Sequence, residues 1–350
     1  MKKVVIISPY LNSLTRGIER FSINLADALV KNGIEVVIYT RRQKQGQLCG
    51  ILNSAIKVRT VPYFGYFVDI WSAMFYRLWL MIDNPEATIL NFFYHGEERL
   101  PKGRKYLYIL HSPASQIPQR YEYVKSKIAA FKNIHIVAIS QLVQKDAIPY
   151  FKGKPMSLIY NGTDTDTFKP IDDKDNQDKF RIITPAAYEE RKGMHYMIEA
   201  LADCKYKDQI QYDIYGTGDA EYGNYLKSLI EKYHLENVVI LKGSVNNIPE
   251  VEPQYDLFAL LSKGEAFALT PIEAMACGVP ILVSTYAPYP EFVKKDFGFM
   301  VNRENKEEIQ AILSDLIENP DKQRKLAMAA RQASLAYSWD EVVKQYISLL

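Results

Sequence analysis

The hydrophobic positions of the chain form short β-branched runs that alternate with longer segments of helical periodicity. In the first half, the runs predict strands at Val4–Ser8, Glu35–Tyr39, Thr88–Phe92, Tyr106–Leu110, His135–Ile139 and Met156–Tyr160. In the second half, they predict strands at Phe180–Thr184, Gln211–Tyr215, Val238–Leu241, Leu257–Leu261 and Pro280–Val283. Strands that alternate with helices are typical of parallel sheets covered by helices. The pattern therefore predicts an α/β protein with two doubly wound sheets.

Helical periodicity fills the segments between these strands. The helix after Gly17 places Ile18, Phe21, Leu25 and Leu29 on one face, and later helices are expected from about Gly193, over Tyr222–Tyr233, near Pro271–Ala276 and from Lys306 onward. The polar, acidic stretch Asp172–Lys179 has the composition of a linker. We therefore expect an N-terminal lobe at 1–170, a C-terminal lobe at 171–335 and a last helix at 336–350 that returns to the first lobe. Ligands of such sheets bind at the carboxyl ends of the strands, here in a cleft between the lobes.

Composition excludes several classes of protein. The 350 residues are 48% hydrophobic and 24% charged, which is the balance of a globular protein with a sizeable core. The three cysteines, Cys49, Cys204 and Cys277, match neither a disulfide framework nor a zinc site and indicate a reducing compartment. The apolar run Val4–Ile7 is too short for a signal peptide, and charged residues interrupt Tyr63–Ile82, the most apolar stretch. We expect a cytoplasmic protein, soluble or peripheral on the inner face of the membrane.

The net charge of +2 conceals an asymmetry between the halves. Residues 1–165 hold 22 Lys and Arg against 11 Asp and Glu, whereas residues 166–350 hold 21 against 30. A split of this kind predicts that the first lobe faces something anionic. We expect no nucleic-acid partner.

Aromatic residues gather in the segment Tyr63–Ile82. Eight of them lie there: Tyr63, Phe64, Tyr66, Phe67, Trp71, Phe75, Tyr76 and Trp79. Trp71, Phe75 and Trp79 repeat on one face of a helix, and a face directed at the core is the favoured interpretation. The alternative joins these rings to the basic residues Lys57, Arg59, Arg77, Arg99, Lys102, Arg104 and Lys105. Aromatic rings beside basic residues suit the headgroup region of an anionic membrane surface. In this alternative, the acceptor is a lipid-linked or anionic glycan.

The strongest chemical signal lies between Leu257 and Val283. A buried strand is followed by a loop that carries Glu265, and then by a helix from about Pro271 with Glu273 in its first turn. Thr270 and Glu273 fit a capping box, which would give Glu273 a purely structural role. In the functional interpretation, the helix N-terminus binds a phosphate and the two carboxylates accept hydrogen bonds from hydroxyl groups. Together these features describe a site for a sugar nucleotide.

Two other motifs favour other chemistry only weakly. Asp164-Thr165-Asp166 has the letters of a metal–diphosphate motif, but such tripeptides are common by chance and a structural role is favoured. Gly216-Thr217-Gly218 follows a strand as a dinucleotide fingerprint would, but Glu221 stands where the third glycine belongs.

The Glu265/Glu273 pair, followed by the run Ala274–Pro280, resembles the donor-site signature of family-4 retaining glycosyltransferases (glycosyl transferases group 1) of GT-B fold. The resemblance covers nearly the whole chain. Its other ordered matches are Gly17–Arg20, Asn161–Asp164, Lys192–Gly193, Gly216–Gly218 and Gly298. It implies two Rossmann-like lobes with a cleft between them, the first binding the acceptor and the second binding a nucleotide sugar.

The resemblance also implies roles for single residues. Glu265 would hold hydroxyls of the transferred sugar, and Glu273 would hold those of the ribose. Lys192 would neutralise the leaving diphosphate, where a fixed cation lowers the barrier. The backbone from Ala266 through Phe267, Ala268 and Leu269 to Thr270 would line the sugar and the diphosphate.

Further roles fall on the loops around this segment. Gly17 would let the first-lobe loop approach the diphosphate without an intervening side chain. His111 would lie near the sugar and the attacking hydroxyl. Gly216 belongs to the later glycine loop, and the loop that holds Gly243 and Val245 would meet the base.

The sequence departs from the family pattern in two places. Ala266 and Ala268 replace glycines of the usual Glu-Gly-Phe-Gly, so either the sugar pocket is narrowed or the backbone there never needs a positive φ. The family arginine is missing near Ala187, and Arg191 is the candidate for the second cation.

By resemblance, the chain is expected to be a retaining hexosyltransferase that uses a nucleotide sugar and neither metal nor cofactor. The donor is expected to be UDP- or GDP-linked rather than ADP-linked. The expected acceptor is a glycan or lipid-linked glycan of cell-surface polysaccharide synthesis. Two alternatives remain open, a GT-B epimerase or phosphorylase and a non-catalytic module that binds nucleotide sugars or glycans.

Overall fold

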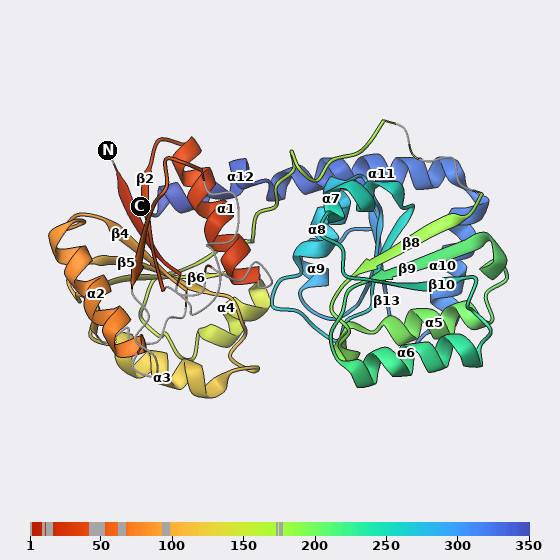
Figure 1. Cartoon of the computed structure of the whole chain (residues 1–350), viewed down its shortest axis with the longest axis horizontal. Coiled ribbons are helices and arrows are strands. Elements are labelled where there is room, and N and C mark those ends of the chain that lie inside the picture. The colour runs from red at the N-terminus through yellow and green to blue at the C-terminus, as the bar shows by residue number, and fades with distance from the viewer. Residues whose placement is uncertain are drawn as a thin grey trace. The chain divides into compact units, whose positions relative to one another are not determined.

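The computed structural model describes residues 2–8, 11, 17–41, 53–61, 68–92, 99–172, 174 and 178–350, with the side chains of 68–70 left aside. The chain divides into two units (Figure 1). Unit 1 comprises Met1–Gly162 and Trp339–Leu350, and unit 2 comprises Thr163–Ser338.

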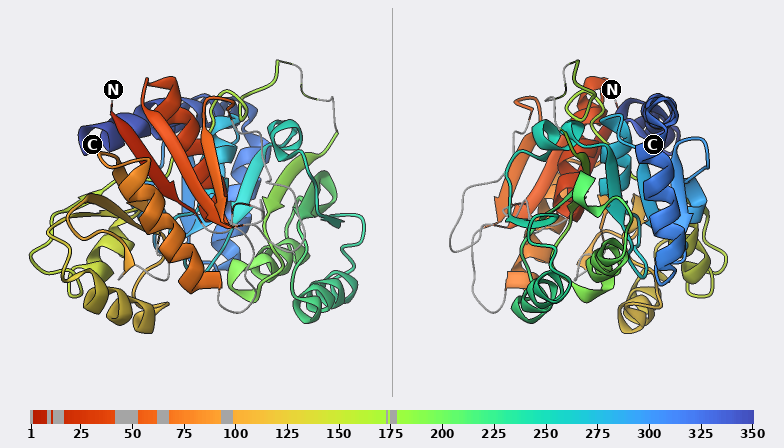
Figure 2. Two further views of the ribbon diagram at one scale, coloured as in Figure 1. Left: turned by 60° about the vertical axis from the view of Figure 1, so that its left-hand side comes forward. Right: turned by 90° about the vertical axis from the view of Figure 1, so that its right-hand side faces the viewer.

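Unit 1 is built on a seven-stranded, all-parallel sheet in the order β3-β2-β1-β4-β5-β6-β7. Its strands are β1 (Lys3–Ile7), β2 (Glu35–Arg41), β3 (Lys57–Val61), β4 (Thr88–Asn91), β5 (Lys105–Leu110), β6 (Asn133–Ala138) and β7 (Met156–Leu158). Its helices are α1 (Gly17–Lys31), α2 (Val68–Ile82), α3 (Pro118–Ile128), α4 (Gln141–Ala147) and α12 (Trp339–Ser348). The left view of Figure 2 shows β1, β2 and β3 side by side with α1 behind them.

Unit 2 is built on a six-stranded, all-parallel sheet in the order β10-β9-β8-β11-β12-β13. Its strands are β8 (Phe180–Pro185), β9 (Ile210–Tyr215), β10 (Val239–Gly243), β11 (Leu257–Leu260), β12 (Ile281–Ser284) and β13 (Gly298–Val301). Its α-helices are α5 (Met194–Ala202), α6 (Ala220–Lys232), α7 (Ile248–Val251), α8 (Leu269–Ala276), α9 (Tyr289–Phe292), α10 (Lys306–Glu318) and α11 (Pro320–Ser334). Short 3-10 turns are η3 (Glu190–Lys192), η4 (Lys207–Gln209), η5 (Glu252–Gln254) and η6 (Leu335–Tyr337). Helix α5 packs with α6 and α10, and α8 packs with α11, on opposite faces of the sheet (Figure 1).

The prediction of two doubly wound parallel sheets is confirmed. In each sheet the strand order reverses beside its first strand, between β1 and β4 in unit 1 and between β8 and β11 in unit 2. Ligands of such sheets bind outside the carboxyl ends of the strands at this reversal. The topology therefore directs attention in unit 2 to the segments that follow β8 and β11.

The division between the units differs from the boundaries predicted from the sequence. The chain passes between the units at 162/163 and 338/339, rather than at 170/171 and 335/336. Segment 163–168 belongs to unit 2 because Arg331 Nη1 donates to the carbonyls of Thr165 and Phe168, each at 3.1 Å. The described residues of the predicted linker, 172, 174, 178 and 179, also lie within unit 2, where Lys174 Nζ donates to the Tyr255 carbonyl at 2.7 Å.

The last helix, α12, belongs to unit 1 and packs against α1. The ring of Phe21 on α1 meets that of Trp339 edge-on, with the ring centres 5.3 Å apart. Gly162 is required at this point, since an added Cβ would lie 2.6 Å from the Trp339 ring.

The aromatic helix is oriented differently from the favoured prediction. The buried face of α2 consists of Ser72, Ala73, Tyr76 and Leu80. Trp71 is 43% exposed, so the prediction that it faces the core is wrong. Phe75 and Trp79 are half-buried. Four aromatics of the same segment, at 63, 64, 66 and 67, lie outside the described residues.

Candidate functional site

The two segments that follow β8 and β11 meet at a carboxylate with two cations. Glu265 Oε1 accepts hydrogen bonds from Lys192 Nζ at 2.8 Å and from Arg191 Nη1 at 3.0 Å. The side chains of Lys192 and Glu265 are 16% and 12% exposed, whereas that of Arg191 is 47% exposed. We call these three residues the ionic triad. They lie where the topology places a ligand, and they are three of the residues predicted from the sequence.

Arg191 has a second partner outside the triad. Its Nε donates to Glu189 Oε2 at 2.5 Å. The two neighbouring carboxylates raise the pKa of Arg191 above its ordinary value, despite the opposing effect of burial. Arg191 therefore lies beside Lys192 as a charged side chain that a carboxylate on each side holds in place. This position suits the second cation, which the family arginine missing near Ala187 would otherwise supply.

Two glycines allow the triad segments to approach each other. Gly193 has φ +73°, and an added Cβ would lie 2.1 Å from the Leu261 carbonyl oxygen, so no side chain fits there. Gly264 has φ +144°, which only glycine adopts readily. The backbone then turns so that the Glu265 amide donates to the Ala287 carbonyl at 3.1 Å.

The helix after Glu265 begins earlier than predicted. Helix α8 starts at Leu269, with Ala268 as the N-cap and no side chain that caps it. The predicted capping box of Thr270 and Glu273 is therefore wrong, because both residues already lie inside the helix. The amides of an N-terminal turn that lacks a side-chain cap can donate to an anion, which the positive end of the helix dipole also attracts.

The structure also addresses the two alanines that replace family glycines. Among the described residues, the non-glycine residue with positive φ is His234, so neither Ala266 nor Ala268 has one. Ala268 itself has φ −82°. This favours the second sequence interpretation, in which the backbone here has no need of glycine.

Glu273, on α8, belongs to a buried acidic pair with Glu252. Its side chain is 4% exposed, and the nearby Glu252 is fully buried. Burial, and then the charge of Glu273, raise the pKa of the Glu252 carboxyl well above its ordinary value. Cys277 Sγ lies 3.9 Å from Glu252 Oε2, and burial raises its pKa as well. Glu252 is not recognisable from the sequence, because a glutamate before a proline in a polar loop carries no sign of burial.

The remaining predicted residues of unit 2 lie on the same edge of the sheet. Gly216 directly follows β9, with φ +153°, and an added Cβ would lie 2.0 Å from the Ala186 carbonyl oxygen. Its amide donates to the carbonyl of Gly243, which ends β10, at 2.8 Å. Half-buried Val245 follows in the next loop. The strands β10, β9, β8 and β11 are consecutive in the sheet, so the segments that follow them lie in a row along the same edge.

Two predicted residues belong to unit 1. Gly17 is the first residue of α1, and no atom of the described residues beyond its neighbours along the helix lies within 4 Å of the position that a Cβ would occupy. His111 follows β5 and packs edge-on against Phe21, with ring centres 4.7 Å apart. Burial lowers the pKa of His111 to about 3, so the imidazole is neutral near pH 7. Its Nε2 is buried and has no hydrogen-bond partner within the described chain.

Asp164 has the structural role that the sequence favoured. Its Oδ1 accepts from the amides of Asp166 and Thr167, each at 3.1 Å, and its Oδ2 accepts from the Thr167 hydroxyl at 2.6 Å. These bonds form a local turn just inside unit 2 and occupy both oxygens.

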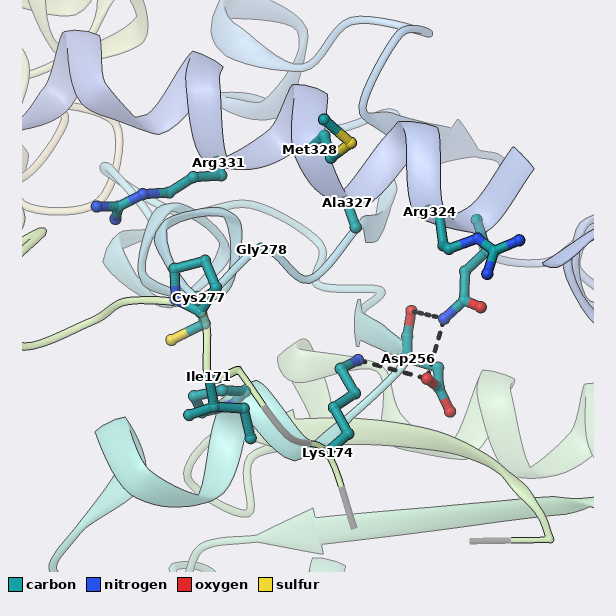
Figure 3. Close-up of a pocket in the computed structure, with 12 residues that line it drawn as sticks. Ile171, Lys174, Asp256, Cys277, Gly278, Arg324, Ala327, Met328 and Arg331 are labelled. Carbon is teal, nitrogen blue, oxygen red and sulfur yellow. Dashed lines mark hydrogen bonds and ion pairs between the residues drawn. The ribbon is translucent and has the colours of Figure 1, made fainter. Parts of the chain in front are cut away.

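A separate cavity of about 550 Å³ opens elsewhere in unit 2, between α11, the end of α8 and the segment around Ile171 (Figure 3). It adjoins the start of β11, where Asp256 accepts from Gln323 Nε2 at 2.9 Å. Arg331 is also in its wall and donates to three backbone carbonyls. None of the predicted donor-site residues lines it. The charged groups of this wall serve the fold and do not add to the site at the triad.

Comparisons with known proteins agree with this architecture. A family model described as glycosyl transferases group 1 matches residues 166–333, and one described as glycosyltransferase family 4 matches residues 15–167. The putative colanic acid biosynthesis glycosyltransferase WcaL of Escherichia coli is 30% identical over 151 residues, which are 39% of this chain and 35% of that protein. The alignments to the first three curated relatives span between 35% and 64% of the relatives' length.

Solved structures share the fold over the whole chain. Sucrose-phosphate synthase of Thermosynechococcus elongatus superposes with a TM-score of 0.82 at 18% identity, over 100% of this chain and 98% of that one. HepE of Anabaena, in complex with UDP and glucose, gives 0.78 at 20% identity and covers 99% of each chain. The two family models together run from residue 15 to residue 333, and the two parallel sheets have the GT-B arrangement of strands. The chain belongs to the glycosyltransferases of group 1 and family 4, and it has their GT-B fold.

Proposed function

We propose that this glycosyltransferase moves a hexose from a nucleoside-diphosphate sugar to an acceptor hydroxyl, with retention of the anomeric configuration. The acceptor is a glycan or lipid-linked glycan of cell-surface polysaccharide synthesis. The name of the E. coli relative, which refers to colanic acid biosynthesis, supports this acceptor class. The donor is UDP- or GDP-linked, and the complex of HepE with UDP makes UDP the first nucleotide to test.

The ionic triad beside the N-terminus of α8 is the observation that carries the proposal. Lys192 and Arg191 present two positive charges to a diphosphate, and the first turn of α8 adds backbone amides. Glu265 holds both cations in place and keeps its other oxygen for the sugar hydroxyls. Glu273 takes the ribose hydroxyls, and the loop at Gly243 and Val245 meets the base.

In the proposed mechanism the acceptor hydroxyl attacks from the face that the diphosphate leaves. The departing diphosphate accepts the proton of that hydroxyl, while Lys192 stabilises the charge that develops on the leaving oxygen. His111, neutral near pH 7, can share a hydrogen bond with the sugar or the acceptor without adding a charge.

Thermal unfolding with UDP, GDP and ADP, each without metal, tests the donor site. A ligand at 100 times its dissociation constant stabilises the folded protein by about 2.7 kcal/mol, which raises the melting temperature by several degrees. We expect a shift with one nucleotide, and Lys192→Met should reduce that shift to about half or less, as tenfold weaker binding requires. No shift with any nucleotide at millimolar concentration would contradict the donor site. Incubation with donor alone then separates transfer from epimerisation, since an epimerase converts the donor without an acceptor.

Helix α2 supplies a surface for a lipid-linked acceptor. Its outer face consists of apolar side chains that are 43–67% exposed: Trp71, Met74, Leu78, Met81 and Ile82. Arg77 is exposed on the adjoining part of the helix. Exposed apolar patches of this kind often mark interaction sites, and an apolar face with a tryptophan and a flanking arginine suits the headgroup region of a bilayer. In the part of the chain that the structure describes, no helix has both the length and the apolar character needed to cross a bilayer. We infer peripheral contact of unit 1 with the anionic inner face of the membrane.

Sedimentation with vesicles of anionic lipid at low salt tests this contact. Leu78→Ser with Met81→Ser should reduce the bound fraction severalfold. Met328→Ser is the control, because Met328 is 75% exposed on α11 of unit 2. Equal binding by all three proteins, or no binding by the parent chain, would contradict a membrane role for α2.

A further inference from the structure

A buried arginine just after β13 packs against two tyrosine rings. The guanidinium carbon of Arg303 lies 4.6 Å from the ring centre of Tyr196 and 5.3 Å from that of Tyr286. Arg303 is 7% exposed, and its buried Nε has no hydrogen-bond partner among the described residues. A guanidinium is attracted to aromatic faces, and the attraction is stronger where water is excluded. The two rings therefore act as a clamp on this side chain.

Each tyrosine of the clamp belongs to a segment that is tied to the ionic triad. Tyr196 lies in the first turn of α5, four residues after Lys192. Tyr286 directly precedes Ala287, whose carbonyl accepts the hydrogen bond from the Glu265 amide at 3.1 Å. One buried cation thus connects the segment of Lys192 to the backbone that supports Glu265.

Other contacts anchor the two ends of the segment that contains Ala287. Ser284 Oγ donates to the Ser262 carbonyl at 2.6 Å, and the hydroxyls of Tyr289 and Ser262 lie 2.7 Å apart. Between these anchors, Tyr286 is 40% exposed and its ring packs on Arg303. Loss of the guanidinium would therefore loosen Ala287 while the ends of the segment stay in place.

We propose that Arg303 is a positioning residue for Glu265. It does not touch the sugar. It holds Tyr286, and through the Ala287 carbonyl it fixes the backbone from which the Glu265 carboxylate reaches its partners. The inference rests on the proposed function for the role of Glu265 in turnover, whereas the mechanical link can be tested in the free protein.

Hydrogen–deuterium exchange of the free protein tests the link directly. Arg303→Met should speed exchange severalfold within residues 263–268 and 285–290, and Tyr286→Leu should do the same. Tyr286→Phe keeps the ring face and should keep the protection. If Arg303→Met does not fold, Arg303→Lys and Tyr286→Leu provide the comparison. Unchanged exchange at the Glu265 amide in the folded variants would overturn the proposal, whatever the protein's substrate is.

A double-mutant cycle tests the functional consequence. With UDP-glucose as the probe and released UDP as the readout, Arg303→Met should lower turnover about tenfold or more, because small misplacements of a reacting group are costly. The affinity for UDP alone should stay within about twofold. In a Glu265→Gln background, Arg303→Met should have no further effect, since its effect passes through Glu265. Equal losses in both backgrounds would overturn the proposal.

Arg181→Met is the matched control for general destabilisation. The Arg181 guanidinium carbon lies 4.5 Å from the centre of the Tyr255 ring, and Arg181 Nε is buried without a partner in the described chain. This arginine lies at the start of β8, away from the triad segments. Arg181→Met should lower the melting temperature without changing hydrogen–deuterium exchange at the Glu265 amide or the turnover. Equal effects of both arginine variants on exchange and turnover would contradict the clamp.

A parent chain that binds no nucleotide would contradict the proposed function, while the exchange experiment would still decide the role of Arg303.

Discussion

Lys192 Nζ lies 2.8 Å from Glu265 Oε1, although 73 residues separate the two in the sequence. The contact follows from the sheet order, because β8 and β11 are neighbours and each residue comes shortly after one of these strands. Both side chains are largely buried, so the carboxylate and the ammonium each offset the desolvation of the other. The nucleotide sugar that we propose as the donor would meet two cations that are already oriented and a carboxylate that is held in place.

Replacement of Glu265 should separate turnover from nucleotide binding. Glu265→Ala removes the group proposed to hold the sugar hydroxyls, and it also frees two cations for the diphosphate. We expect turnover to fall by about 100-fold or more, while the affinity for the nucleoside diphosphate stays the same or increases. Calorimetry with the nucleotide and initial rates with the nucleotide sugar provide the two numbers. Equal losses in both would contradict the assigned role.

The two cations should contribute unequally to diphosphate binding. Lys192 is more buried than Arg191, and exposed charges are screened more strongly by water and salt. Lys192→Met should weaken nucleoside-diphosphate binding about tenfold or more at any ionic strength. Arg191→Met should weaken it severalfold at low salt and little at high salt. Titrations at two salt concentrations measure this, and the nucleoside without phosphates is the control, because neither variant should change its affinity.

The sequence predicted the sheets well and the side-chain contacts poorly, for physical reasons. Parallel strands buried on both faces leave continuous apolar runs, so β8 and β11 were expected within a residue of their ends. Strand β3 at the edge of its sheet was not expected, because its residues alternate between exposed and half-buried and resemble a loop. The start of α8 was placed too late because Pro271 is typical of a first helical position, yet it lies in the third.

In the candidate site, the residues marked by motifs were predicted from the sequence, and those whose surroundings depend on tertiary packing were not. Glu265 and Lys192 were found because motifs mark them, and Arg191 because it adjoins Lys192 where the family arginine is missing. Gly264 could have been found from its place directly before Glu265. Arg303 carries no such signal, since its contacts depend on which strand ends are neighbours. The burial of Glu252 likewise arises only from helix packing, and the local sequence around it is polar.

Glu252 should make the protein less stable as the pH rises. Its pKa in the folded protein lies well above the ordinary 4.5, so above pH 4.5 the folded state keeps a proton that the unfolded state has released. The free energy of unfolding therefore falls with rising pH until the pH reaches the folded pKa. Glu252→Gln removes this dependence, and its melting temperature should exceed that of the parent by a margin that grows between pH 5 and pH 8. Glu250→Gln, which changes an exposed carboxylate nearby, should follow the parent curve. Parallel curves for Glu252→Gln and the parent would show that Glu252 does not retain its proton.

His111 should make the protein less stable as the pH falls. Burial lowers its pKa from 6.5 to about 3, so between these values the unfolded chain binds a proton that the folded protein does not. The free energy of unfolding should therefore fall as the pH drops below 6.5, by at most about 1.4 kcal/mol for each pH unit. His111→Phe keeps a ring against Phe21 and removes the titrating group, so its melting temperature should fall less between pH 6.5 and pH 5.

The same neutral imidazole constrains the kinetics. His111 stays uncharged above about pH 3. The dependence of kcat/KM on pH around 6.5 should therefore be the same in the parent and in His111→Phe. His234→Asn is the control for both measurements, since His234 is exposed in unit 2. The contrary result would be a step near pH 6.5 in the kcat/KM profile of the parent that is absent from His111→Phe and present in His234→Asn. His111 would then carry a proton during the reaction. Its proposed part as a neutral hydrogen-bonding partner would then be wrong, and unit 1 would supply a general acid or base.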